Sequence, residues 1–322
     1  MKLLITGIHG FVGSNLVSAL SRDMEIYGLD IIAPQKEGIV QTFSWNDLEQ
    51  EKIPEVDAII HLAGKAHDTK NKSTADVYFK VNTELTQKIF DYFLLSSAKK
   101  FIFFSSVKAA ADFVPGKILT EDVTPAPVGP YGESKIKAEE YILSKDVPEG
   151  KSVYILRPCM IHGPGNKGNL NLLYNVVRKG IPWPLGAFDN KRTFTSIDNL
   201  TFVIRNLIEK SVPSGIYHMA DDEAISTNHL IEIICSSIGH KAHIWRLNRS
   251  FITFCAKLGT ILHLPLNEDR LHKLTENYVV SNNKIKRALG IDRMPLRAEE
   301  GLARTMNSFK CQRSEERRVG KE

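Results

Sequence analysis

The chain has 322 residues, of which 43% are hydrophobic, and its formal net charge at pH 7 is +5. This is enough apolar material for one large domain or two closely joined ones. The basic residues are scattered and form no Lys/Arg run interleaved with aromatic residues, so the composition indicates no nucleic-acid footprint and leaves anionic small molecules as ligands.

Cysteine use and hydropathy argue for a cytoplasmic protein without membrane insertion. The four cysteines form no C-x-x-C pair, which predicts neither a metal site nor a disulfide framework. No signal-peptide pattern precedes the first apolar strand. The longest apolar stretch, residues 251–266, is interrupted by Lys257, Gly259 and His263 and is shorter than a membrane span. We interpret it as a buried helix in preference to a membrane-surface contact.

The chain begins with a strand, a glycine-rich loop and a helix. Residues 3–6 are apolar, three glycines follow at G-x-x-G-x-x-G spacing, and Leu16, Val17 and Leu20 then mark one face of a helix. Backbone N–H groups in such a loop can approach a pyrophosphate at the helix N-terminus, where the helix dipole favours negative charge. The predicted cofactor-binding residues of this loop are Gly7, Gly10, Phe11, Val12 and Gly13.

An acidic residue after the second strand indicates which dinucleotide binds. Residues 25–29 form this strand, and Asp30 follows, positioned to accept hydrogen bonds from the adenosine ribose hydroxyls. No arginine follows it in residues 31–33 to bind a 2′-phosphate. The sequence therefore predicts NAD, with NADP as the less favoured cofactor.

Two further strands bring polar and small residues to the same edge of a sheet. Residues 56–62 end in His61, a satisfied core residue in our interpretation, and Leu62, Ala63 and Gly64 let the chain pass close to a flat cofactor. A helix over residues 74–97 and an aromatic strand over 100–104 follow, ending at Ser106. Strands separated by helical crossovers predict an α/β, doubly wound parallel sheet whose ligands gather at the strand carboxyl ends.

Tyr131 and Lys135 lie four residues apart at the start of a helix predicted to run to about residue 144, so they share one face. An ammonium group beside a phenol lowers the phenol pKa, which an acid-base tyrosine requires. The motif alone also fits a surface tyrosine beside a solvated lysine. Its position after a sheet edge that holds Gly7, Asp30 and Ser106 favours the catalytic interpretation.

The second half changes in composition. A strand over residues 152–156 ends at Arg157-Pro158, and glycines and prolines punctuate residues 163–186. Strand and helix patterns return at 192–209 and 215–219, and helices follow to residue 309. We predict a dinucleotide-binding domain over residues 1–162, to which 193–219 return, and a smaller, mostly helical substrate lobe over 163–192 and 220–309.

The last ten residues, 313–322, have no apolar periodicity and are predicted to be disordered. They read like the conceptual translation of a common sequencing-adapter oligonucleotide. We therefore interpret them as a non-native tail and leave them out of the functional argument.

Taken together, these motifs resemble those of the extended short-chain dehydrogenase/reductases, in particular the NAD-dependent epimerase/dehydratase family that acts on nucleotide sugars. The resemblance covers residues 1–309 and implies a Rossmann-type fold. It rests on the glycine loop, Asp30, residues 61–64, Asn82, residues 105–106, the Tyr131/Lys135 pair and Arg157-Pro158.

The resemblance also implies residue roles. Tyr131 would exchange the proton of the sugar hydroxyl, Ser106 would share that oxygen, and Lys135 would bind the nicotinamide ribose and lower the tyrosine pKa. The remaining cofactor contacts implied are Leu62, Ala63, Gly64, Asn82 and Pro158. A UDP-sugar diphosphate would be bound by Arg192, with Arg270 as a second candidate.

Two departures from the family pattern narrow the reaction. Val107 and Lys108 follow Ser106 where sugar dehydratases carry Asp and Glu, so 4,6-dehydration is not expected. Met160 stands where many 4-epimerases have Asn, which removes a polar contact to the substrate. The favoured prediction is a UDP-hexose or UDP-N-acetylhexosamine 4-epimerase, the alternative an NAD(P)H-dependent reductase of UDP-4-keto-6-deoxy-hexosamines, and the remote alternative a non-catalytic dinucleotide sensor.

The resemblance further implies a homodimer and a role in making activated sugars for surface polysaccharide. In relatives the helices matching residues 74–97 and 131–144 pair across a two-fold axis. Phe79, Leu85, Ile89 and Phe93 add apolar residues on more than one side of the first helix, although these could instead only cover the sheet.

Overall fold

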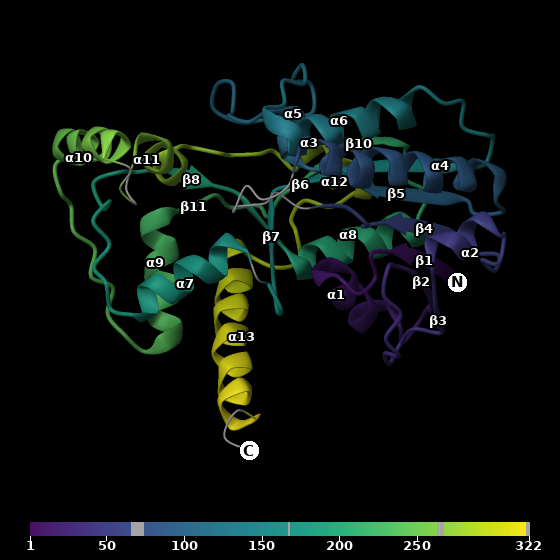
Figure 1. The fold of residues 1–322 in the computed structure, drawn as a ribbon, viewed down its shortest axis with the longest axis horizontal. Coiled ribbons are helices and arrows are strands. Elements are labelled where there is room, and N and C mark those ends of the chain that lie inside the picture. Colours follow the sequence, from purple (N-terminus) through teal and green to yellow (C-terminus); the bar gives the residue numbers. More distant parts are fainter. Residues whose placement is uncertain (66–73, 167, 263, 265–266, 320–322) are drawn as a thin grey trace.

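The computed structural model describes residues 1–65, 74–166, 168–262, 264 and 267–319, with the backbone alone from residue 312 (Figure 1). Its centre is a seven-stranded parallel sheet of order β10-β6-β5-β4-β1-β2-β3. This order confirms the predicted doubly wound fold. The strands are β1 (Lys2–Thr6), β2 (Glu25–Leu29), β3 (Gln41–Phe43), β4 (Ala58–His61), β5 (Lys100–Phe104), β6 (Ser152–Pro158) and β10 (Gly215–Met219).

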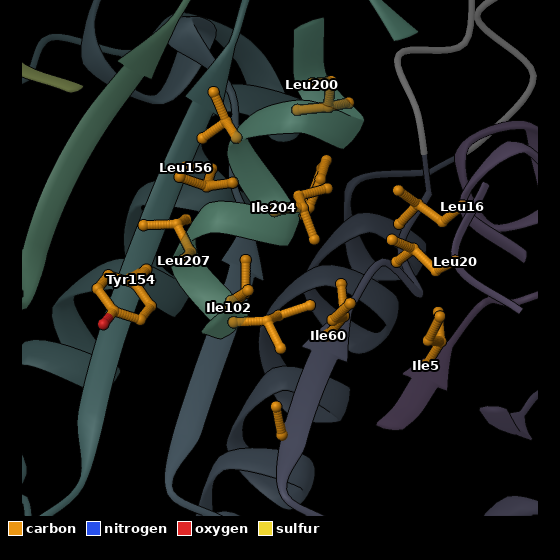
Figure 2. Close-up of a cluster of buried hydrophobic side chains, with 14 of the residues drawn as sticks. Ile5, Leu16, Leu20, Ile60, Ile102, Tyr154, Leu156, Leu200, Ile204 and Leu207 are labelled. Atoms are coloured by element: carbon orange, nitrogen blue, oxygen red, sulfur yellow. The ribbon is translucent and has the colours of Figure 1, made fainter. Parts of the chain in front are cut away.

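Helices cover both faces of the sheet because its strands alternate buried side chains between them. On β1, Leu3 and Ile5 join one apolar cluster and Leu4 joins the other. Figure 2 shows the first cluster, in which Ile5 of β1 lies near Leu20 of α1 and Leu156 of β6 lies near Leu207 of α8. Around the sheet lie α1 (Phe11–Leu20), α2 (Trp45–Glu49), α4 (Leu85–Leu95), α5 (Val107–Ala110), α6 (Gly129–Leu143), α8 (Ile197–Glu209) and α12 (Asn283–Leu289).

The helix predicted over residues 74–97 contains a π-helical segment. It consists of α3 (Ala75–Tyr78), η1 (Phe79–Glu84) and α4, and Asn82 lies inside the π segment, a feature frequent at functional sites. Ile89 and Phe93 are fully buried against the sheet. These two residues therefore cover the sheet, and the homodimer stays a prediction that rests on the resemblance.

The second lobe is mostly helical and lies at one end of the long axis (Figure 1). In it α7, α9 and α13 share one apolar cluster, and α10 and α11 border a smaller one. Its elements are β7 (Met160–His162), β8 (Lys191–Arg192), β9 (Phe194–Ser196), β11 (Ile225–Ser226), α7 (Asn169–Arg178), α9 (Thr227–Ile238), α10 (Arg249–Ile261), α11 (Glu268–Thr275) and α13 (Ala298–Val319).

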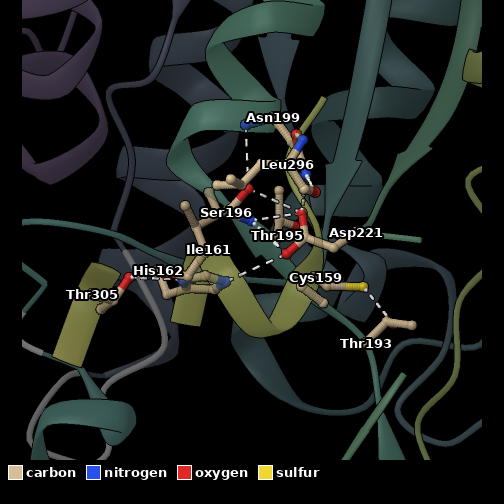
Figure 3. A network of polar contacts seen from close by, with 12 residues as sticks. Cys159, Ile161, His162, Thr193, Thr195, Ser196, Asn199, Asp221, Leu296 and Thr305 are labelled. Carbon is tan, nitrogen blue, oxygen red and sulfur yellow. Dashed lines mark hydrogen bonds and ion pairs between the residues drawn. The ribbon is translucent and has the colours of Figure 1, made fainter. Parts of the chain in front are cut away.

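A buried polar network joins this lobe to the sheet (Figure 3). The Asp221 carboxylate accepts hydrogen bonds from the Ser196 backbone N–H (3.0 Å) and from the Asn199 side chain (2.7 Å). His162 lies between Asp221 and Thr305 of α13, at 3.4 Å and 2.9 Å. The network fixes the end of β9 and the start of α8 relative to the C-terminal helix α13.

Two elements differ from the sequence prediction. The helix predicted to be buried at residues 251–266 is not, since Phe251, Phe254 and Ile261 of α10 are 57%, 58% and 71% exposed. It packs inward only through a narrow side that includes Ile252 and Ala256. The tail also differs, because α13 continues through residues 313–319.

The helical tail has a simple physical reason. Residues 313–319 contain Ser, Glu, Arg and Val but no Gly or Pro, and Glu and Arg favour helix, so α13 propagates beyond its buried part. Residues 320–322 of the predicted tail lie outside the described part of the chain. Its non-native origin stays a prediction.

Candidate active site

Three polar side chains meet where β5 ends. Ser106 is the N-cap of α5, and its Oγ accepts from the Lys108 backbone N–H at 3.2 Å. The Ser106 hydroxyl also makes a hydrogen bond with the Tyr131 phenol. One turn after Tyr131, the Lys135 Nζ donates to the Phe104 carbonyl at 2.8 Å. The structure thus brings the predicted Ser106, Tyr131 and Lys135 to one place at the carboxyl edge of the sheet.

The pKa of Tyr131 moves in the direction opposite to our prediction. Burial raises it, the hydrogen bond from Ser106 lowers it, and the neighbouring Tyr78 ring, edge-on with centroids 6.3 Å apart, raises it. Lys135 is not among the described groups that shift this pKa, and its ammonium donates to the Phe104 carbonyl, so its role in lowering the tyrosine pKa stays a prediction. In the site as described, Tyr131 is a protonated phenol at neutral pH.

Lys135 itself is almost fully buried, with 5% of its surface exposed. Burial lowers its pKa to about 8, and Glu139, one turn further along α6, raises it. Its Nζ also lies 5.0 Å from the centre of the Phe103 ring, a cation–π distance. The structure therefore holds a nearly dry ammonium group below the site.

This burial predicts a pH dependence of stability. Between pH 8 and 10.5 the unfolded chain keeps the Lys135 proton that the folded chain has lost, so the free energy of unfolding should rise with pH. Relative to a Lys135→Met variant, the cofactor-free wild type should gain about 3 kcal/mol over this interval. Urea unfolding of both proteins at several pH values measures the gain.

Lys137→Met is the control, because Lys137 is an exposed lysine on the same helix. It should leave the pH dependence of unfolding as in the wild type. A difference between wild type and Lys135→Met that does not change with pH would contradict the buried ammonium.

A buried ion pair between Glu139 and Arg157 lies beneath the site. Arg157 was identified from the sequence, but Glu139 was missed. Glu139 accepts from Arg157, whose Nη2 lies 2.6 Å from Glu139 Oε2, and both side chains are at most 2% exposed. Ser105 hydrogen-bonds the same carboxylate. The signal was present, since Glu139 follows Tyr131 and Lys135 at the i+4 spacing that places all three on one helix face.

The glycine loop between β1 and α1 has the close contacts that a phosphate-binding turn needs. Gly7 has φ +66°, and a Cβ there would lie 2.9 Å from the Ala63 backbone. A Cβ on Gly13 would lie 2.5 Å from the Ile8 carbonyl oxygen. Gly10 caps α1 without a side-chain hydrogen bond, and no acidic residue lies in the first turn, which begins with Phe11 and Val12. The first N–H groups of α1 are therefore presented without a competing side chain.

Asp30 lies against this loop. Its carboxylate accepts from the His9 backbone N–H at 3.0 Å and from the Ile31 backbone N–H at 2.7 Å. A carboxylate has about four acceptor positions, so two stay available for ribose hydroxyls. The strand end and the loop thus hold the predicted acid in a fixed orientation.

Asn82 fixes the small-residue turn after β4. Its Oδ1 accepts from the Lys65 backbone N–H at 2.7 Å, and its Nδ2 donates to Ser134 Oγ at 3.0 Å. A Cβ on Gly64 would lie 3.0 Å from Asn82 Oδ1 and 3.1 Å from Lys135 Nζ. The predicted Asn82, Gly64 and Lys135 are therefore neighbours, and no larger residue fits at Gly64 without displacing them.

His61 is a satisfied core residue, as interpreted from the sequence. Thr86 donates its hydroxyl proton to the Asn82 carbonyl, so His61 must donate from Nε2 to Thr86 and accept at Nδ1 from Thr6. The Thr6 Oγ1 then accepts from the backbone N–H groups of Leu62 and Ala63. This neutral imidazole, whose pKa burial holds well below its usual range, positions the turn that carries the predicted cofactor contacts.

The predicted substrate arginines lie in the second lobe. Arg192 contacts Glu276 at 3.0 Å and the Lys273 carbonyl, and its Nε is buried without a hydrogen-bond partner within the described residues. The backbone of Arg192 forms a β-bridge with Tyr278. The Tyr278 hydroxyl donates to the carbonyl of Ala111, the residue directly after α5. Arg270 is exposed on α11 and is not placed beside Ser106 by any described contact. Pro158 is buried at the end of β6.

Comparison with known proteins agrees with this fold. Residues 3–220 match the family described as NAD dependent epimerase/dehydratase. The chain is 29% identical over 323 residues to a UDP-glucose 4-epimerase of Vibrio cholerae, which covers 96% of this chain and 95% of that protein. It is 25% identical to a UDP-2-acetamido-2,6-beta-L-arabino-hexul-4-ose reductase of Pseudomonas aeruginosa, over 86% of this chain and 66% of that protein.

Solved structures share the fold. MoeE5 in complex with UDP-glucuronic acid and NAD superimposes with a TM-score of 0.74 at 18% identity, over 97% of this chain and 100% of that one. At this identity the likeness supports the architecture. Together with the family match over two thirds of its length, it shows that this chain belongs to the NAD-dependent epimerase/dehydratase family of nucleotide-sugar enzymes.

Proposed function

We propose that this protein is an NAD-dependent oxidoreductase that acts at C4 of a UDP-hexose or UDP-N-acetylhexosamine, as a 4-epimerase. The observation that supports this most is the hydrogen-bonded Ser106–Tyr131 pair above the buried Lys135 ammonium, at the sheet edge that also carries the glycine loop. The relatives are named as epimerases and reductases of such sugars.

The residues present fit a dinucleotide. Gly7, Gly10 and Gly13 leave room at the start of α1 that any Cβ would fill, and the uncapped N–H groups there suit a pyrophosphate. Asp30 suits ribose hydroxyls and has no arginine beside it, which supports NAD over NADP. Bound NAD would supply the redox chemistry, accepting hydride from C4 and returning it. The further contacts we propose are Phe11, Val12, Leu62, Ala63, Gly64, Asn82, Lys135 and Pro158.

The protein's own part is proton transfer and positioning. Tyr131 would take the proton of the C4 hydroxyl at its phenol oxygen and later return it, while the Ser106 hydroxyl would hold the same sugar oxygen. Because burial raises the pKa of Tyr131, its ionisation needs positive charge nearby, and such a charge lowers a phenol pKa. The buried Lys135 supplies one such charge if its Nζ turns from the Phe104 carbonyl.

Arg192 is the proposed contact to the UDP diphosphate. Its Nε is buried and lacks a partner among the described residues, a costly state that a phosphate oxygen would relieve. Arg270, exposed on α11 in the same lobe, is the weaker second candidate. A diphosphate bound by both arginines would hold β8 and α11 together. The Tyr278 hydroxyl, which donates to the Ala111 carbonyl, would link them to the sheet edge that carries Ser106.

A reductase of UDP-4-keto-6-deoxy-hexosamines is the second candidate. Val107 and Lys108 occupy the two positions after Ser106, so neither position supplies a carboxylate for an elimination step. Lys108 pairs with Asp112 at 2.9 Å and lies over the Tyr278 ring. Such a reductase would use the same Ser106, Tyr131 and Lys135 and release oxidised cofactor after each turnover.

The cofactor state of the purified protein tests the proposal. The dinucleotide is released by denaturation and identified, and intact protein is incubated with UDP-GlcNAc and UDP-Glc without added nicotinamide. Retained NAD together with the C4 epimer is the expected result. A protein that is inert until it receives a UDP-4-keto-6-deoxy sugar and NAD(P)H would establish the reductase instead.

Gly13→Ala should lower NAD affinity at least about tenfold, because its Cβ would lie 2.5 Å from the Ile8 carbonyl and the loop must open. Gly168→Ala is the matched control at the start of α7, where the nearest atom lies 3.4 Å away. Titration with NAD followed by tryptophan fluorescence measures both. Equal affinities for the two variants would contradict the proposed pyrophosphate site.

A further inference from the structure

The helix α10 presents an apolar stripe to solvent in addition to its buried side. On a helical wheel the exposed apolar residues fall within an arc of about 100°. They are Phe251 (57% exposed), Phe254 (58%), Leu258 (40%), Ile261 (71%) and, directly after the helix, Leu262 (62%). The inward side, with Ile252, Ala256 and Gly259, is separate from this stripe, and the polar side carries Thr253, Lys257 and Thr260.

The sequence of α10 and the residues before it carries positive charge, and the nearest acidic residues, Glu268 and Asp269, begin α11, where Glu268 contacts Thr260 on the polar side of α10. No Asp or Glu occurs between Glu232 and Glu268. Four exposed basic residues lie in the same stretch: Lys241, Arg246, Arg249 and Lys257. Trp245, 54% exposed, precedes the helix. An apolar helix face with basic and aromatic residues around it is typical of helices that lie in the interface of an anionic bilayer.

The position of α10 makes such contact possible. It lies at one extreme of the long axis of the molecule, in the second lobe (Figure 1). Its 13 residues span about 20 Å, less than the hydrocarbon core of a bilayer at about 30 Å. No helix among the described residues is long and apolar enough to cross a membrane. Contact would therefore be at the surface, with the helix in the plane of the interface.

A second copy of the chain fits this stripe less well. Five side chains that are about half exposed present on the order of 500 Å² in total, and a standard protein interface buries about 800 Å² from each partner. Two copies meeting at α10 would also bring the exposed basic residues of both copies together, which outnumber the neighbouring Glu268 and Asp269. Anionic lipid supplies both the apolar volume and the opposite charge.

We propose that the α10 stripe, residues 251, 254, 258, 261 and 262, docks this protein on the surface of a bilayer that contains anionic lipid. Phe251 and Phe254 enter the headgroup boundary, and Lys257 and Arg246 lie near lipid phosphates. The docking rests on α10 and its flanks alone and does not depend on the reaction at Tyr131.

Co-sedimentation with phosphatidylcholine vesicles, with and without phosphatidylglycerol, tests the proposal. The wild type should bind the phosphatidylglycerol vesicles and dissociate as NaCl rises. Phe251→Glu with Phe254→Glu should lower the partition coefficient about 100-fold or more. Lys257→Gln should lower it about fivefold and weaken the salt dependence.

The matched control is Leu172→Glu with Val176→Glu, two exposed apolar residues on α7 of the same lobe (57% and 43%). It should bind vesicles as the wild type does. Wild type that stays in solution, or binds equally without phosphatidylglycerol, would overturn the proposal. A stripe variant that binds vesicles as the wild type does would also overturn it. If that variant in addition has a smaller mass by light scattering than the wild type, the stripe belongs to a contact with a second copy.

Discussion

Tyr131→Phe should lower turnover of the UDP-sugar substrate about 1,000-fold while leaving bound NAD in place. The variant keeps the ring against Tyr78 and loses only the phenol oxygen that hydrogen-bonds Ser106. Without that oxygen, the variant lacks the proposed acceptor of the hydroxyl proton in step with oxidation at C4. Single-turnover assays, with the dinucleotide content determined on the same samples, measure both quantities.

Tyr141→Phe is the control for this experiment. It removes a phenol from the same helix, and its hydroxyl contacts Asp91 at the surface, at 2.7 Å. Turnover should stay within about twofold of the wild type, since changes at exposed contacts have small effects. Full activity of Tyr131→Phe would show that the phenol is not the acid-base group, whereas no turnover by either the wild type or the variant would favour a dinucleotide sensor.

Glu139→Gln should lower the free energy of unfolding by about 3–5 kcal/mol, because it leaves the buried Arg157 guanidinium without its counter-charge. Three hydrogen bonds join these two side chains, and both are nearly inaccessible to water. Urea unfolding of cofactor-free protein measures the loss. Glu140→Gln, which affects an exposed pair with Lys137, should change stability by less than about 1 kcal/mol.

A double variant separates the charge from the packing. Arg157→Met added to Glu139→Gln removes the uncompensated charge and keeps an unbranched apolar chain in its place, so it should recover part of the lost stability. Equal stability of Glu139→Gln and the wild type would mean that water or another group already screens Arg157, and would contradict a dry ion pair beneath the site.

Much of the fold and of the candidate site follows from local sequence. Continuous apolar runs gave the buried parallel strands, and the glycine spacing placed a turn that tolerates no Cβ at Gly13. Ser106, Tyr131 and Lys135 could be grouped because strand ends of a parallel sheet share one edge. For these residues, the position in the chain determines the position in space.

Other features depend on packing that no local pattern contains. The apolar residues of α10 predicted a buried helix, but burial depends on which elements lie opposite, and only one narrow side of α10 meets other residues. The pKa of Tyr131 is raised first by burial, which depends on the elements packed around the phenol and not on its spacing to Lys135. Glu139 has the right spacing, yet its role requires Arg157 from β6, 18 residues away.

The central claim is a reversible oxidation at C4 within one bound complex, and deuterium at C4 tests it most directly. The protein is incubated with UDP-sugar deuterated at C4, without added nicotinamide, and the epimer is examined by NMR. The account predicts an inverted C4 that keeps its deuterium, because the same hydride equivalent returns to the other face. An epimer that carries hydrogen from solvent at C4 would contradict it.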